Sequence, residues 1–185
     1  MILDAAAQVL LRDGYERTST NRIAQRAGVS VGSLYRYFSS KDEILLALLG
    51  REIEHLIQHI VSETSDRSDA TLQESLARLA RATIRGWRYE PRLYRELERV
   101  PRAERDALTR KAYERLEEHL YWLLKRHALE IAHRDLRSAA FVLVNSASGL
   151  TASTDERFFR EQGADELFRL FSGYLLAESS DSAGS

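Results

Sequence analysis

The sequence predicts an all-α fold, and three observations carry this prediction. Apolar residues make up 44% of the 185 residues and recur almost throughout at the three- and four-residue spacing of an amphipathic helix. The chain contains only 2 prolines and 9 glycines, too few for the many turns of an all-β protein. No segment shows the strict apolar–polar alternation of a half-buried strand.

The composition excludes several classes of protein. The chain has no cysteine, which rules out disulfides, thiolate zinc sites and cysteine nucleophiles. Its longest uncharged stretch, 138–154, is 17 residues long and falls short of the roughly 20 apolar residues of a membrane span. No targeting segment is visible. We therefore expect a cytoplasmic protein without a membrane partner.

The first helix is expected over 2–13, because Gly14 follows it and supplies a left-handed C-terminal cap. Two very short helices fit the segment after it. A long helix follows over about 41–63, and Ser40 with Glu43 three residues later forms a capping box at its start.

The second half of the chain is predicted to be helical as well. Proline suits the first turn of a helix, so Pro101 is expected to open one. The later helices are expected over Leu72–Trp87, around Leu93–Leu97, from Pro101 to about 128, over 136–153 and around 167–175. A polar tail over 179–185 is predicted to be disordered.

The two short helices have the pattern of a helix-turn-helix. Thr18 or Ser19 caps the first, which ends at Ala27, and Gly28 adopts the left-handed conformation that a sharp turn needs. Ser30 caps the second, which is expected to run to about residue 37. In this motif the second helix enters the major groove of DNA.

The charge distribution agrees with a DNA-binding segment. The formal net charge of the whole chain is −1, from 27 basic and 28 acidic residues, which by itself argues against nucleic acid as a partner. Residues 15–41, however, hold five basic residues and one acidic residue, a net charge of +4. The other 158 residues carry −5, so a basic segment is joined to an acidic body.

The segment from Thr20 to Lys41 closely resembles the DNA-binding domain of the TetR (tetracycline-repressor) family of bacterial regulators. The matching motifs are Ile23-Ala24, Ala27-Gly28-Val29-Ser30, Gly32-Ser33-Leu34-Tyr35, Tyr37-Phe38 and Ser40-Lys41-Asp42. The resemblance implies about nine helices, a homodimer and repression relieved by a small molecule. It places a DNA-binding domain at 1–45 and a ligand-binding and dimerisation domain at 46–178, before the tail.

Eight residues are the candidates for DNA contact: Thr20, Asn21, Val31, Gly32, Ser33, Tyr35, Tyr37 and Lys41. Hydroxyl, phenol and ammonium groups are typical phosphate ligands. An asparagine such as Asn21 can pair bidentately with adenine, whereas Val31 offers only an apolar contact, for example to a thymine methyl. Gly32 lets the backbone approach DNA closely. The partner is expected to be a double-stranded, palindromic operator.

Aromatic residues in the second half suggest as a set a pocket for a small hydrophobic or aromatic ligand, although ordinary core and interface packing is the better explanation for each of them alone. The candidate ligand-binding residues are Trp87, Tyr94, Tyr113, Trp122, Phe141 and Asn145. Asn145 and Ser148 are polar residues in an apolar helix, so they need a partner in a ligand, a neighbouring helix or a second subunit. No metal site or other cofactor is expected.

Residues 136–150 and 167–175 would carry the dimer in this family. Ala139, Ala140, Ala147 and Gly149 allow close helix approach, and Phe168, Phe171 and Leu175 add bulk; the alternative is an intramolecular hairpin. The sequence thus predicts a ligand-responsive repressor and not an enzyme. The alternatives are a co-regulator or a helical ligand-binding protein that does not bind DNA.

Overall fold

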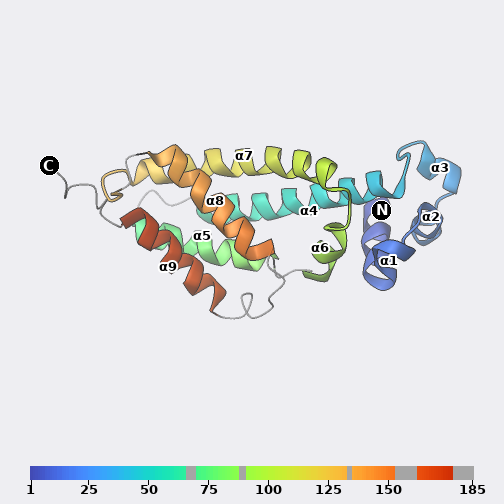
Figure 1. Ribbon diagram of the computed structural model, residues 1–185, viewed down its shortest axis with the longest axis horizontal. Helices are drawn as coiled ribbons and strands as arrows, with labels where there is room; N and C mark the ends of the chain where they lie inside the picture. The colour runs from blue at the N-terminus through green and yellow to red at the C-terminus, as the bar shows by residue number, and fades with distance from the viewer. Residues whose placement is uncertain (66–69, 88–90, 133–134, 153–161, 177–185) are drawn as a thin grey trace. The chain divides into compact units, whose positions relative to one another are not determined.

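The computed structural model describes residues 1–65, 70–87, 91–132, 135–152 and 162–176 (Figure 1). All regular structure in these ranges is helical, as the sequence predicts. The chain divides into two compact units. Unit 1 comprises Met1–His55 and Glu90–Lys111, and unit 2 comprises Leu56–Tyr89 and Ala112–Ser185. Two long helices, α4 (Lys41–Thr64) and α7 (Arg102–Arg126), contribute residues to both units.

Unit 1 is built around the first three helices of the chain. They are α1 (Ile2–Arg17), α2 (Thr20–Ala27) and α3 (Val31–Tyr35), and α6 (Pro91–Leu97) packs on α1. The core of the unit contains completely buried side chains such as Leu10, Ile23 and Leu34. Because one apolar residue comes from each of the first three helices, a single core fixes their mutual orientation.

The first helix ends differently from the prediction. Gly14 lies at φ 76° and ψ 168°, which interrupts the helix, but one further turn continues to Arg17. A positive φ is accessible to glycine at little cost, which explains the residue type. The interruption leaves the backbone N–H of Tyr15 without its helical acceptor, and the Glu96 carboxylate of α6 accepts it at 2.8 Å.

The predicted helix-turn-helix is present. Ser19 caps α2, Gly28 lies in the left-handed region at φ 69°, and Ser30 caps α3 by accepting the Ser33 N–H at 3.0 Å. The second helix ends at Tyr35, two residues earlier than predicted, and a turn follows.

The start of α4 follows the predicted capping box in part. Ser40 Oγ accepts the Glu43 N–H at 3.1 Å, whereas the Glu43 carboxylate reaches back to the N–H of Ser39 at 2.6 Å. The backbone N–H and the hydroxyl of Ser39 both donate to the ionised carboxylate of Glu43, and these two bonds lower the pKa of Glu43.

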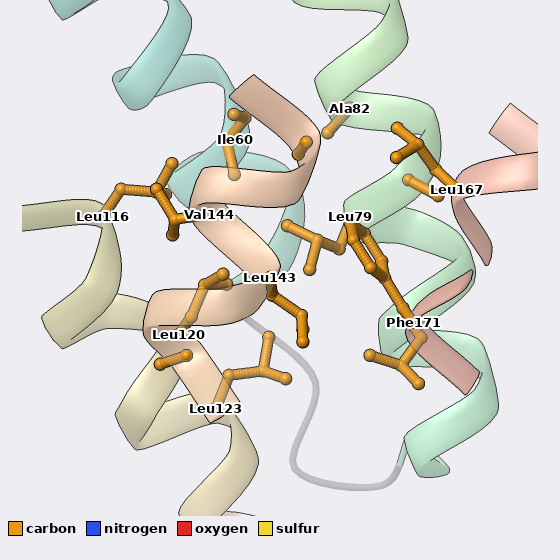
Figure 2. Packing of buried hydrophobic residues seen from close by; sticks show 14 of the residues in the cluster. Ile60, Leu79, Ala82, Leu116, Leu120, Leu123, Leu143, Val144, Leu167 and Phe171 are labelled. Atoms are coloured by element: carbon orange, nitrogen blue, oxygen red, sulfur yellow. The ribbon is translucent and has the colours of Figure 1, made fainter. Parts of the chain in front are cut away.

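Unit 2 consists of α5 (Leu72–Trp87), α8 (Leu136–Ala152) and α9 (Gly163–Leu176) with the later parts of α4 and α7. Figure 2 shows Leu143 and Val144 of α8 next to Leu116 and Leu120 of α7, and Phe171 of α9 beside Leu79 of α5. None of the helices in the described ranges has the length and apolar character to cross a membrane.

Candidate functional site

The end of α3 and the start of α2 meet at the surface of unit 1. The hydroxyls of Thr20 and Tyr35 lie 3.1 Å apart and share a hydrogen bond. The side chain of Tyr35 is 53% exposed, so its phenol can still receive an external partner. Two predicted DNA contacts from different helices thus form one polar surface.

The remaining predicted contacts of this region are also accessible, but not equally. Asn21, Gly32, Ser33 and Tyr37 are exposed, and Val31 is half-buried. The Ser33 hydroxyl shares a hydrogen bond of 2.8 Å with Ser30, which holds it close to the cap of α3. Tyr37 is 68% exposed and lies in the turn after α3, so it is not on the recognition helix where the sequence placed it.

Tyr15 connects three elements of unit 1 and was not predicted as a site residue. Its N–H donates to Glu96 of α6, and its phenol donates to the Asp42 carboxylate of α4 at 2.8 Å. Lys41 donates to the Tyr15 carbonyl oxygen at 2.9 Å and lies 3.9 Å from the centre of the Tyr15 ring. Burial, followed by the neighbouring Asp42, raises the pKa of Tyr15 to about 12.

Lys41 therefore already has partners within unit 1. An ammonium group carries three donors, and the Tyr15 carbonyl takes one of them, so a phosphate contact remains compatible with this position. Lys41 is half-buried, and its ammonium nitrogen is the atom that contacts Tyr15 of α1.

Two basic residues of α2 have polar partners on α1, and one of these partners is acidic. Arg22 lies 2.8 Å from Asp13, and Arg26 donates to the Gln8 side chain at 2.6 Å. Hydrogen bonds from Arg12 and Arg22 lower the pKa of Asp13 well below its ordinary value, although burial opposes them. Within the described residues, Arg36 has neither an ion pair nor a hydrogen bond, so its charge is available to a partner.

Unit 2 contains an apolar pocket. Its empty space is about 400 Å³, a figure that includes the mouth open to solvent. Residues from α4, α5, α7, α8 and α9 line it, and Figure 2 labels several of them, including Leu79, Val144 and Phe171. Nine of the twelve lining residues are apolar, and the other three are Thr83, Tyr113 and Ser148.

Two family models match most of the chain. Residues 2–48 match the bacterial regulatory proteins of the tetR family, and residues 71–175 match the tetracyclin repressor-like C-terminal domain. The chain belongs to the TetR family. The second match covers more than half of the sequence, which extends the assignment beyond the helix-turn-helix.

Individual TetR relatives are similar mainly at the N-terminus. The fatty acid metabolism regulator protein of Bacillus subtilis is 34% identical over 76 residues, which is 41% of this chain and 38% of that protein. The repressor KstR of Mycolicibacterium smegmatis is 47% identical over 55 residues, 30% of this chain and 27% of KstR. The matched segments thus span well under half of both relatives.

The fold is shared over nearly the whole length. The structure of the fatty acid degradation regulator FadR from Bacillus halodurans superposes with a TM-score of 0.73 and covers 93% of both chains at 21% identity. The arrangement of helices is therefore that of a TetR regulator, while so low an identity carries no information about the ligand.

The aromatic residues predicted to bind a ligand are not gathered around the pocket, with one exception. Tyr113 lines it. Trp122 and Phe141 are more than half exposed, and Trp122 donates to Glu118 on the outer face of α7. Tyr94 lies on α6 in unit 1. The side chain of Trp87 is outside the described part of the chain.

The two polar residues of α8 find partners on neighbouring elements. Asn145 is exposed and donates to the Phe141 carbonyl oxygen at 2.8 Å and to Glu117 at 3.3 Å. Ser148 donates to the Tyr113 hydroxyl at the pocket wall. Asn145 therefore lies outside the pocket lining, whereas Ser148 of the same helix is part of it.

Proposed function

We propose that this chain is a DNA-binding transcriptional repressor that acts as a homodimer on a palindromic operator and is released by a small hydrophobic effector. The helix-turn-helix carries this proposal, because its exposed hydroxyls, Asn21 and Arg36 lie on the segment that matches the family. Such a regulator acts where the chromosome lies, which agrees with a cytoplasmic location.

The surface of α8 and α9 supports self-association. Phe141, Leu150, Leu170 and Leu176 are large apolar residues that are 37–54% exposed in the single chain. Large apolar side chains that are exposed in a single chain can be covered by a protein partner. The residues that the sequence assigned to the interface need correction, since Ala139, Ala140, Ala147, Phe171 and Leu175 are buried within unit 2. Sequence spacing alone does not separate a helix face that covers its own core from one that covers a partner.

The pocket of unit 2 supports the effector half of the proposal. Residues of five helices line it, and its walls are predominantly apolar. Pockets of this kind bury most of a small ligand and favour hydrophobic compounds. A ligand that binds one arrangement of the protein better than another shifts the balance between DNA-bound and free forms.

The proposal is tested by letting the purified chain select fragments from the genome that encodes it, followed by sequencing. We expect a short palindromic sequence to be enriched, with binding that weakens as salt increases because phosphate contacts release counterions. A matched variant, Asn21→Ala, is expected to change which sequences are enriched. Failure to retain any fragment at low salt would instead support a co-regulator without DNA binding.

A further inference from the structure

We propose that the effector is an uncharged, largely aliphatic molecule that carries one hydrogen-bond acceptor, such as a ketone or ester carbonyl, and that Tyr113 donates to this acceptor. The inference rests on the proposed function, because it names the chemical class that the pocket of unit 2 accepts. The three hydroxyl groups on the pocket wall carry the argument.

Two of these hydroxyls already donate their protons to acceptors within the chain. Thr83 Oγ1 donates to the Leu79 carbonyl oxygen at 2.9 Å within α5. The Ser148 hydroxyl donates to the Tyr113 hydroxyl oxygen, which links α8 to α7. Each hydroxyl has only one proton, so neither Thr83 nor Ser148 can donate to a ligand without giving up this bond.

Tyr113 differs from them. Its oxygen accepts from Ser148, and within the described part of the chain nothing accepts its own proton. The phenol is half-buried on a wall that is otherwise apolar. A hydroxyl proton in apolar surroundings is stabilised when it donates to an acceptor. A bound molecule with a carbonyl oxygen therefore supplies the acceptor that the Tyr113 hydroxyl lacks among the described residues.

The same wall disfavours a charged group. None of the twelve lining residues is basic or acidic, so an ionised carboxylate or phosphate inside the pocket has no counter-ion. Burying an unpaired charge in apolar surroundings costs far more free energy than one neutral hydrogen bond returns. The pocket therefore selects neutral ligands, and an anionic head group would have to remain outside.

The experiment measures displacement of Nile red from the purified full chain by 2-decanone, decanoate and pentylbenzene at pH 8. The ketone offers an acceptor, the carboxylate is ionised, and pentylbenzene has no carbonyl. We expect 2-decanone to bind at least about 10-fold more tightly than decanoate. Decanoate binding as tightly as the ketone would overturn the proposal.

The role of Tyr113 is tested with Tyr113→Phe against the matched control Tyr121→Phe, which makes the same change on α7 outside the pocket. Tyr113→Phe should weaken 2-decanone about fivefold and leave pentylbenzene unchanged, while the control changes neither. An equal loss for both probes, or no loss, contradicts donation by Tyr113. DNA retention is measured separately, so absence of DNA binding with these ligand results intact would refute only the repressor proposal.

Discussion

A single hydrogen bond joins the two helices that are expected to face DNA. Removing the phenol oxygen in Tyr35→Phe abolishes the bond to Thr20 and removes one of the predicted phosphate ligands. We expect DNA affinity to fall about fivefold, since a neutral hydrogen bond contributes roughly 1 kcal/mol. The slope of log affinity against log salt should not change, because no charge is lost. Fluorescence anisotropy at several salt concentrations measures both quantities, and Tyr94→Phe on α6 is the matched control.

Lys41 combines an internal bond with a predicted phosphate contact, and Lys41→Met separates them. Loss of the bond to the Tyr15 carbonyl and of the contact with its ring should lower the melting temperature. Loss of a phosphate contact should reduce the salt slope by about 1. We expect both effects. A lower melting temperature with an unchanged salt slope would show that Lys41 only positions α1 against α4.

The caps and turns of the helix-turn-helix could be predicted from the sequence, but the long-range contacts that hold its helices in place could not. Caps and turns such as Ser30 and Gly28 depend on neighbours within a few residues, which a sequence displays directly. The bond between Tyr15 and Glu96 joins residues 81 positions apart, and no local pattern encodes it. For this reason Tyr15 was overlooked although it contacts both α4 and α6.

At the scale of elements, two glycines of the helix-turn-helix have different roles. Gly28 has a positive φ, so Gly28→Ala should destabilise the chain by about 1–2 kcal/mol. Gly32 lies in α3 with ordinary dihedral angles, and an added methyl group meets only Ser30 Oγ at 4.0 Å. Gly32→Ala should therefore keep or raise stability while weakening DNA binding. Denaturant unfolding and anisotropy measure the two effects, and equal stability of both variants would contradict the assignment.

The contact between the end of α4 and α7 makes stability depend on pH. His119 Nε2 lies 2.7 Å from the Thr64 hydroxyl, and burial, aided by Arg126, lowers the pKa of His119 below 6.5. The unfolded chain then binds the proton more readily than the folded chain, so this stability is present above pH 6.5 and is lost as the pH falls below it.

We therefore expect the melting temperature to decrease between pH 7.5 and pH 5.5, and to decrease less in His119→Gln. The variant removes the titrating group but keeps a side-chain donor for Thr64. His55→Gln on the exposed face of α4 is the control and should retain the wild-type pH dependence. Identical pH profiles for His119→Gln and the wild type would exclude His119 as the cause.

Across the whole molecule, the positions of the helices could be predicted from the sequence, but which face of each helix lines the pocket and which is exposed could not. Helical spacing identified the long helices of the chain to within a few residues. It assigned aromatic residues to a pocket, whereas the structure lines that pocket chiefly with aliphatic side chains. Large aromatic side chains also cover the outside of α7, where Lys125 lies 4.6 Å from the centre of the Trp122 ring. The spacing of apolar residues in the sequence shows that a helix has an apolar face and a polar face, but it does not show which other residues cover each face.

The exposed apolar surface of α8 and α9 provides the last prediction, which concerns assembly. Leu170 is 43% exposed on α9, so Leu170→Glu should alter the single chain little but place a charge in the proposed dimer interface. We expect light scattering to change from about twice the chain mass of 21.2 kDa to a single chain. Binding to a palindromic fragment should then weaken at least about 10-fold, because one reading helix no longer acts together with a second.

The control Leu129→Glu changes a fully exposed leucine beyond α7 and should leave the mass unchanged. A Leu170→Glu chain that keeps the dimer mass would move the interface away from this part of α9.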